Sequence, residues 1–123
     1  MVSCKDENRM MLDISANGRT TIVLLPRRFD IDTAPDIDTE LKPVIAQKPS
    51  RLLFDLANTD YVSSAGMRVL LNVLHQVRHN GGTVALSSPG RQVQYVLEVT
   101  KFTKIFPVYP SREDALRELN EGA

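Results

Sequence analysis

The sequence is short of the residues on which several classes of protein depend. It holds one cysteine, Cys4, among 123 residues. A lone cysteine cannot form a disulfide within the chain, and it excludes a Cys₂His₂-type zinc site. A reducing compartment, the cytoplasm, is therefore the simplest expectation. We also expect no cofactor.

Long apolar runs and an excess of one charge are also missing. The apolar runs, such as Thr21–Leu25, are far shorter than the ~20 residues that a membrane-spanning helix needs. Lysine plus arginine number 15, as do aspartate plus glutamate, so the formal net charge is zero. This balance argues against a protein that binds nucleic acid through counterion release. We expect neither a membrane nor a nucleic acid as a partner.

The motifs of common catalytic sites are absent from the sequence. It has no Gly-rich phosphate loop, which argues against a built-in ATPase, and no Gly-x-Ser-x-Gly turn. His75 and His79 are four residues apart and share a helix face, but no third metal ligand is evident. The apolar residues of the same helix place both histidines toward solvent. We therefore expect no metal site and no enzymatic activity.

The domain organisation is simple. A length of 123 residues fits one domain, and a hydrophobic fraction of 42% suffices for one core. We expect residues 1–8 to be a flexible lead-in and residues 9–121 to form the single domain.

Turn signals and apolar periodicity predict alternating strands and helices. Asn17-Gly18 predicts a hairpin that leads into a strand over Thr21–Leu25, with positive φ at both turn residues. A helix should begin near Thr33, and Pro43 should kink or end it. Further expected elements are strands at 52–56, 83–86 and 105–109, and helices at about 65–80, around 93–97 and after 111. This order predicts an α/β fold, with a mixed sheet of about five strands and helices packed mainly on one face.

The junction between the buried strand and the long helix is the most informative segment. Asp55-Leu56 ends the strand, and Ser63-Ser64 precedes the helix, where either hydroxyl can cap the first turn. Gly66 permits a close approach of another chain segment or an unusual backbone angle. Taken alone, the serine pair would be interpreted as an ordinary helix cap.

With its surroundings, this junction resembles the signature of the STAS domain, and in particular the stand-alone bacterial anti-sigma factor antagonists. Asp55-Leu56 matches the strand end of the family, and Ser63-Ser64-Ala65-Gly66-Met67 matches the tetrapeptide with its following apolar residue. Phe29-Asp30, Gly81-Gly82 and the pattern from Val93 to Ile105 extend the resemblance over nearly the whole chain. Two positions depart from the family, since Ser63 stands where Asp is frequent and Arg28 replaces a usual Gly.

The resemblance implies a non-enzymatic protein in a three-protein switch. Unphosphorylated, it would bind an anti-sigma factor that is also an ATP-dependent serine kinase, and so release a sigma factor. Phosphorylation of Ser64, the serine two before the glycine, would abolish that binding, and a PP2C-type serine phosphatase would reverse it. The free protein would be a monomer or weak dimer. The residues expected at the partner contact are Asp30, Ser63, Ser64, Ala65, Gly66, Met67 and Arg68.

Two alternatives stay open. A STAS domain can be a scaffold or accessory subunit of a signalling or transport complex without phosphate control, although the serine at position 64 favours the switch. A small hydrolase that uses Ser64 as nucleophile would need a base and an oxyanion site. The acidic residues between Asp30 and Glu40 are interpreted mainly as a solvated helix start, because the helix dipole favours acids there. Asp30 is the exception, since it matches a family position beside the phosphorylated loop.

Overall fold

The computed structural model of the protein describes residues 11–121. The expectations for Cys4 and for the lead-in at residues 1–8 therefore lie outside the described residues, as do residues 9 and 10 of the expected domain. Within the described part, no helix has both the length and the apolar character that crossing a membrane requires.

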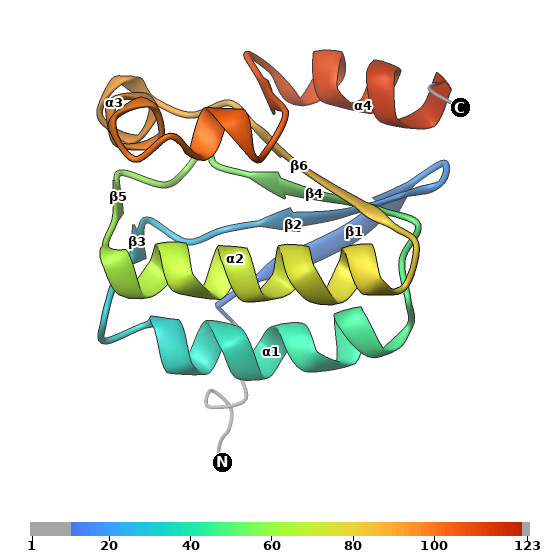
Figure 1. Ribbon diagram of the computed structural model, residues 1–123, viewed down its shortest axis with the longest axis horizontal. Helices are drawn as coiled ribbons and strands as arrows, with labels where there is room; N and C mark the ends of the chain where they lie inside the picture. Colours follow the sequence, from blue (N-terminus) through green and yellow to red (C-terminus); the bar gives the residue numbers. More distant parts are fainter. Residues whose placement is uncertain (1–10, 122–123) are drawn as a thin grey trace.

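A five-stranded mixed sheet forms the centre of the fold (Figure 1). β1 and β2 form an antiparallel hairpin, and β2, β4, β6 and β7 then run parallel to one another. A two-stranded parallel pair, β3 with β5, lies beyond the ends of β2 and β4. The strands are β1 (Asp13–Asn17), β2 (Thr20–Leu24), β3 (Arg28–Phe29), β4 (Arg51–Asp55), β5 (Tyr61–Val62), β6 (Thr83–Ser87) and β7 (Val108–Tyr109).

Helices cover both faces of the sheet, but unequally. The helices are α1 (Ala34–Ala46), α2 (Ser64–His79), α3 (Arg91–Val99) and α4 (Arg112–Glu121), with a 3₁₀ turn η1 at Phe102–Lys104. α1 and α2 lie side by side against one face, while α4 lies on the other (Figure 1). α3 and η1 contribute to the same core as α1 and α2. The predicted α/β fold, with helices mainly on one face, is confirmed.

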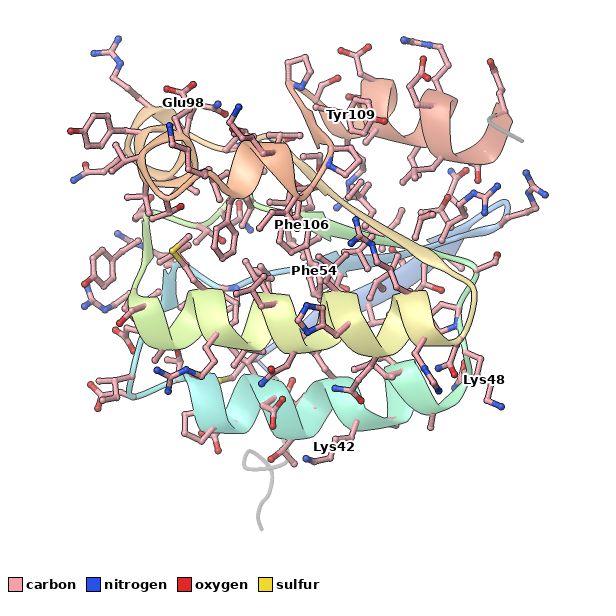
Figure 2. The ribbon with its side chains drawn as sticks, in the orientation of Figure 1. Lys42, Lys48, Phe54, Glu98, Phe106 and Tyr109 are labelled. Atoms are coloured by element: carbon pink, nitrogen blue, oxygen red, sulfur yellow. The ribbon has the colours of Figure 1, made fainter. Side chains whose placement is uncertain are left out.

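The alternation of side chains along the central strand explains this arrangement. Phe54 belongs to the larger core, which α1 and α2 cover, whereas the neighbouring Leu53 packs with Ala115 and Leu119 of α4. Successive residues of a strand point to opposite faces, so a strand that is apolar on both faces needs cover on both. Figure 2 shows Phe54 in the interior, near Phe106, which stacks on Phe102 with ring centroids 5.6 Å apart.

A buried charge ties α4 to the end of β4. The carboxylate of Asp55, which is 3% exposed, accepts a hydrogen bond from Arg112 Nε at 2.7 Å and another from the Ala57 N–H at 2.9 Å. A buried carboxylate with both a cation and a backbone donor is far less costly than an unpaired one. The strand-end aspartate therefore anchors the first residue of the last helix.

One local prediction was wrong, and one of the two outcomes expected at Pro43, the end of the helix, does not occur. The turn residues of the first hairpin are Gly18 and Arg19, since Asn17 pairs with Thr20, and of these two only Gly18 has positive φ, at 59°. A two-residue turn with glycine in the first position needs positive φ only there. The helix α1 also continues past Pro43 to Ala46. Buried residues on both sides of the exposed proline, Leu41, Val44 and Ile45, hold the last turn against the core.

The predicted strand at 105–109 is shorter than expected. η1 occupies residues 102–104, and β7 begins only at Val108. Phe106, 1% exposed, packs into the larger core instead of joining the ladder.

Candidate functional site

The two serines at the start of α2 have different roles. Ser63 is the residue that caps the helix: its backbone is extended, and its Oγ accepts a hydrogen bond from the Gly66 N–H at 3.4 Å. Its own N–H donates to the Phe29 carbonyl oxygen at 2.9 Å. Ser64 is the first helical residue, is exposed, and makes no hydrogen bond through its hydroxyl to any described residue. Of the two serines that could cap the helix, Ser63 is the one that does, and the Ser64 hydroxyl makes no hydrogen bond within the described residues.

Gly66 lets α2 approach β3 closely. A Cβ atom at this position would lie 2.5 Å from the Phe29 carbonyl oxygen and 2.9 Å from Cγ of its ring. The same carbonyl already accepts from the Ser63 N–H, and the ring is fully buried, so neither neighbour is free to move. The absence of a side chain at Gly66 therefore allows the first turn of α2 to pack directly against Phe29 of β3.

Replacing Gly66 with alanine should lower the free energy of unfolding by about 1–2 kcal/mol. Alanine is favoured over glycine in a helix by ~1 kcal/mol, but the contact with the Phe29 carbonyl should outweigh that gain, as overpacking typically costs about 1–3 kcal/mol. Urea denaturation measures the change. Gly90→Ala is the matched control, because a Cβ atom there meets nothing within 4 Å. A Gly66→Ala protein more stable than the parent would contradict the close approach.

Asp30 organises the loop opposite Ser64. Its Oδ1 accepts from the Thr33 N–H at 3.1 Å and from the Asp32 N–H at 3.0 Å, while Thr33 Oγ1 accepts from the Asp30 N–H at 2.9 Å. Oδ2 accepts from Arg28 Nε at 2.8 Å. Burial acts to raise the pKa of Asp30, but these hydrogen bonds outweigh it and the net pKa is lowered. The carboxylate is therefore charged near neutral pH and makes its hydrogen bonds within the loop. Asp30 is only 6% exposed, so it offers little surface to a partner.

The clamped loop presents an apolar side chain that the sequence interpretation did not single out. Ile31 follows Asp30 and is 74% exposed, the highest value among the exposed large hydrophobic residues of the described chain. Tyr61 of β5 is 44% exposed, and the Arg28 guanidinium lies over its ring at 5.1 Å. Nothing in the periodicity marked either residue, because both lie in irregular segments between the predicted elements.

A shallow groove runs from this loop along the seam between α1 and α2. Its volume is about 240 Å³, and Arg68 and Asp38 lie on its two sides. The full lining is Ile31, Ala34, Pro35, Asp38, Ala65, Arg68, Val69 and Asn72. The groove therefore joins the exposed loop to the exposed side of the first turns of α2.

The seven predicted site residues come together at this corner, but not all of them reach the surface. Ser64 and Arg68 are exposed, and Ser63 and Ala65 are half-buried. The buried members are Asp30, Gly66 and Met67. The exposed residues can contact a partner, whereas the buried ones shape the surface.

The histidines lie too far from Ser64 to act as its base. His75 is eleven residues further along α2, which places it about 16 Å away along the helix axis, and His79 is more distant still. A serine nucleophile needs a base within hydrogen-bond reach. Both histidines are exposed, and no cluster of three or more metal-ligating side chains exists within residues 11–121. The geometry argues against the hydrolase alternative.

Comparisons with known proteins agree with this fold. Residues 11–115 match the STAS domain family. BtrV of Bordetella bronchiseptica, named as an anti-sigma factor antagonist, is 39% identical over 82 residues, which are 67% of this chain and 71% of that protein.

Solved structures show the same fold. An anti-sigma factor antagonist structure from Thermotoga maritima, so named provisionally, superimposes with a TM-score of 0.83 at 21% identity, covering 90% of this chain and 96% of that one. The anti-sigma factor antagonist SpoIIAA in its unphosphorylated form gives a TM-score of 0.72 at 16% identity, covering 86% and 94%. The chain therefore belongs to the STAS domain family and, within it, groups with the anti-sigma factor antagonists.

Proposed function

We propose that the protein is the antagonist in a phosphorylation-controlled partner switch. The unphosphorylated form binds an anti-sigma factor that is also a serine kinase, which frees a sigma factor, and phosphorylation of Ser64 ends the binding. The observation that carries the proposal is that the two serines differ in their contacts. Ser63 caps α2, while the Ser64 hydroxyl is exposed and makes no hydrogen bond within the described residues. A hydroxyl that the fold itself does not use can be modified without unfolding the domain.

The proposed contact surface is the corner around Ser64. Ser64, Arg68 and Ile31 are its exposed members, with Tyr61 nearby on β5, which itself contacts α2. Asp30 holds the backbone of the loop that carries Ile31, so the position of this residue is fixed before a partner binds. A preorganised apolar anchor beside an arginine is typical of the residues that contribute most to binding.

The modification requires a phosphoryl donor that the partner brings. The Ser64 Oγ attacks the γ-phosphorus of Mg²⁺-bound ATP, the Oγ–P bond forms, the bond from phosphorus to the bridging oxygen breaks, and ADP leaves. A base of the kinase takes the hydroxyl proton. A PP2C-type phosphatase restores the serine by hydrolysis and releases inorganic phosphate. Because ATP and sigma factors meet there, the switch operates in the cytoplasm.

The size of the effect is sufficient for a switch. A phosphate adds about −1.5 to −2 charges at pH 7, which the positive end of α2 tolerates within the folded domain. Burying such a charge without a partner in an interface costs roughly 2–5 kcal/mol. At about 1.4 kcal/mol per factor of ten, the affinity falls more than tenfold.

Phosphorylation by the native organism's lysate tests the proposal. The purified protein is incubated with lysate and Mg²⁺-ATP, recovered, and mapped by peptide mass spectrometry. We expect phosphate on Ser64, none on Ser63, and no labelling of the domain in Ser64→Ala. Immobilised unmodified protein should retain a histidine-kinase-like ATPase that phosphorylated protein does not retain. Equal retention of another assembly by both forms, with no phosphate on Ser64, would favour the scaffold function.

A further inference from the structure

Arg68 is an exposed cation that has no partner among the described residues. It lies one helical turn after Ser64 and forms no ion pair or hydrogen bond with any residue in the described range 11–121. Side chains four residues apart on a helix are neighbours, with Cβ atoms on the order of 6 Å from each other. The guanidinium therefore extends from the same face of α2 as the Ser64 hydroxyl and within its reach.

The charged groups that face Arg68 across the groove do not hold it. Asp38 on α1 lies on the other side of the groove, and its carboxylate pairs instead with Lys42 of the same helix at 3.6 Å. Lys42 extends from the outer side of α1 (Figure 2). Asp32, in the loop before α1, is exposed. The Asp30 carboxylate already accepts hydrogen bonds from Arg28 and from two backbone N–H groups.

The positive end of α2 tolerates a phosphate on Ser64, and the acidic residues near the start of α1 favour a cation beside it. Asp38 lines the groove opposite Arg68, and Asp30, Asp32 and Asp36 stand nearby in the sequence, before or in the first turn of α1. Like charges that lie close together are unfavourable. Arg68 is the guanidinium nearest in sequence to Ser64, and a guanidinium presents several N–H donors that match phosphate oxygens.

We propose that Arg68 is the internal counter-ion of a phosphate on Ser64. In the unmodified protein the guanidinium is free to bind an acidic or carbonyl group of the partner. After phosphorylation it turns back one helical turn and binds the phosphate oxygens of its own chain. This inference rests on the proposed modification of Ser64, and it adds a second effect to it: one phosphate both places a charge in the contact surface and withdraws the arginine from it.

The test uses the full chain with phosphoserine incorporated at position 64 during translation, so no kinase is needed. The probe is the ³¹P NMR signal of that phosphoserine, titrated between pH 4 and pH 8, where its second ionisation occurs near pH 6. A nearby cation favours the dianion and lowers its pKa. We expect the phosphate pKa in the parent chain to be lower by about half a pH unit than in Arg68→Gln, equivalent to ~0.7 kcal/mol.

Two further variants separate a specific pair from a general charge effect. Arg68→Lys should recover part of the shift, because an ammonium keeps the charge but not the paired donors of a guanidinium. Arg117→Gln removes the same charge from α4, where Arg117 pairs with Asp114 at 2.9 Å on the opposite face of the sheet, and should leave the phosphate pKa unchanged. Thermal unfolding confirms that each variant is folded.

Equal phosphate pKa values in the parent chain and in Arg68→Gln would overturn the proposal, as would a shift of the same size in Arg117→Gln. Such a result would leave the partner switch untouched, since the lysate experiment decides whether Ser64 is phosphorylated. Conversely, the phosphate pKa could differ clearly between the parent chain and Arg68→Gln while Ser64 stays unmodified in the lysate. That result would contradict the proposed function but support the ion pair.

Discussion

Replacing Leu70 with alanine should lower the free energy of unfolding by about 2–5 kcal/mol, the usual cost for a buried leucine. Leu70 lies in the middle of α2, is 0% exposed, and belongs to the larger core together with Val23, Phe54 and Leu86 of the central strands. The truncation loses apolar contacts and leaves a cavity that packed strands cannot close. Small domains have a total stability of only roughly 5–15 kcal/mol, so urea denaturation should show a large shift of the midpoint.

Leu71→Ala is the matched control for this prediction. Leu71 follows directly on the same helix but is only partly buried at the edge of the same core. The same atoms are removed with less cavity formation, so the loss should be clearly smaller. Equal losses for the two variants, or a Leu70→Ala protein as stable as the parent, would mean that the face of α2 in contact with the sheet is misassigned.

Ser64→Asp should keep the fold and lose the kinase partner. An acid in the first turn of a helix is favoured by the helix dipole, and the exposed Ser64 side chain makes no hydrogen bond within the described chain that the change would break. In the contact surface the carboxylate is an unpaired charge, so the affinity for the kinase should fall at least tenfold. Calorimetry with the captured kinase measures the affinity, and thermal unfolding measures the stability.

Ser64→Asn separates the effect of charge from that of size. Asparagine has nearly the shape of aspartate without its charge, so it should lose much less affinity than Ser64→Asp if charge drives the switch. Similar losses for both variants would show that the site is limited by space. A well-folded Ser64→Asp protein that binds the kinase as tightly as the parent would contradict phosphate control altogether.

Much of the fold could be predicted because its signals are local. The apolar segment 52–56 is buried on both faces and could only be a central strand, and the spacing of Met67, Leu70 and Leu74 marked the inner face of α2. The cap of α2 was also visible in the Ser63-Ser64 pair, of which Ser63 accepts from the Gly66 N–H. Caps depend on neighbours three residues away, so the chain itself carries the information.

The features that local patterns missed depend on contacts that hydrophobic periodicity does not encode. The two-residue pairing of β3 with β5 has no periodicity of its own, and it forms because β2 and β4 are already neighbours in the sheet. Pro43 was expected to kink or end the helix, yet α1 continues to Ala46, because core contacts on both sides outweigh the missing N–H donor of the proline. The exposure of Ile31 follows from the reciprocal hydrogen bonds of Asp30 and Thr33, which no periodicity encodes.

The sequence alone determined the order of the main elements, the strand-to-helix junction and the place of the serine pair in it, because each depends on residues close together in the chain. Only the tertiary structure decided which members of the predicted site reach the surface. Gly66 is buried against the Phe29 carbonyl, and the Asp30 carboxylate is hydrogen-bonded within its own loop. Ser64 and Arg68 are exposed, and their side chains make no hydrogen bond or ion pair within the described chain. Gly66 is buried by a segment more than thirty residues away, whereas the bonds of Asp30 lie within residues 28–33, and in both places burial and the pairing of polar groups are settled together.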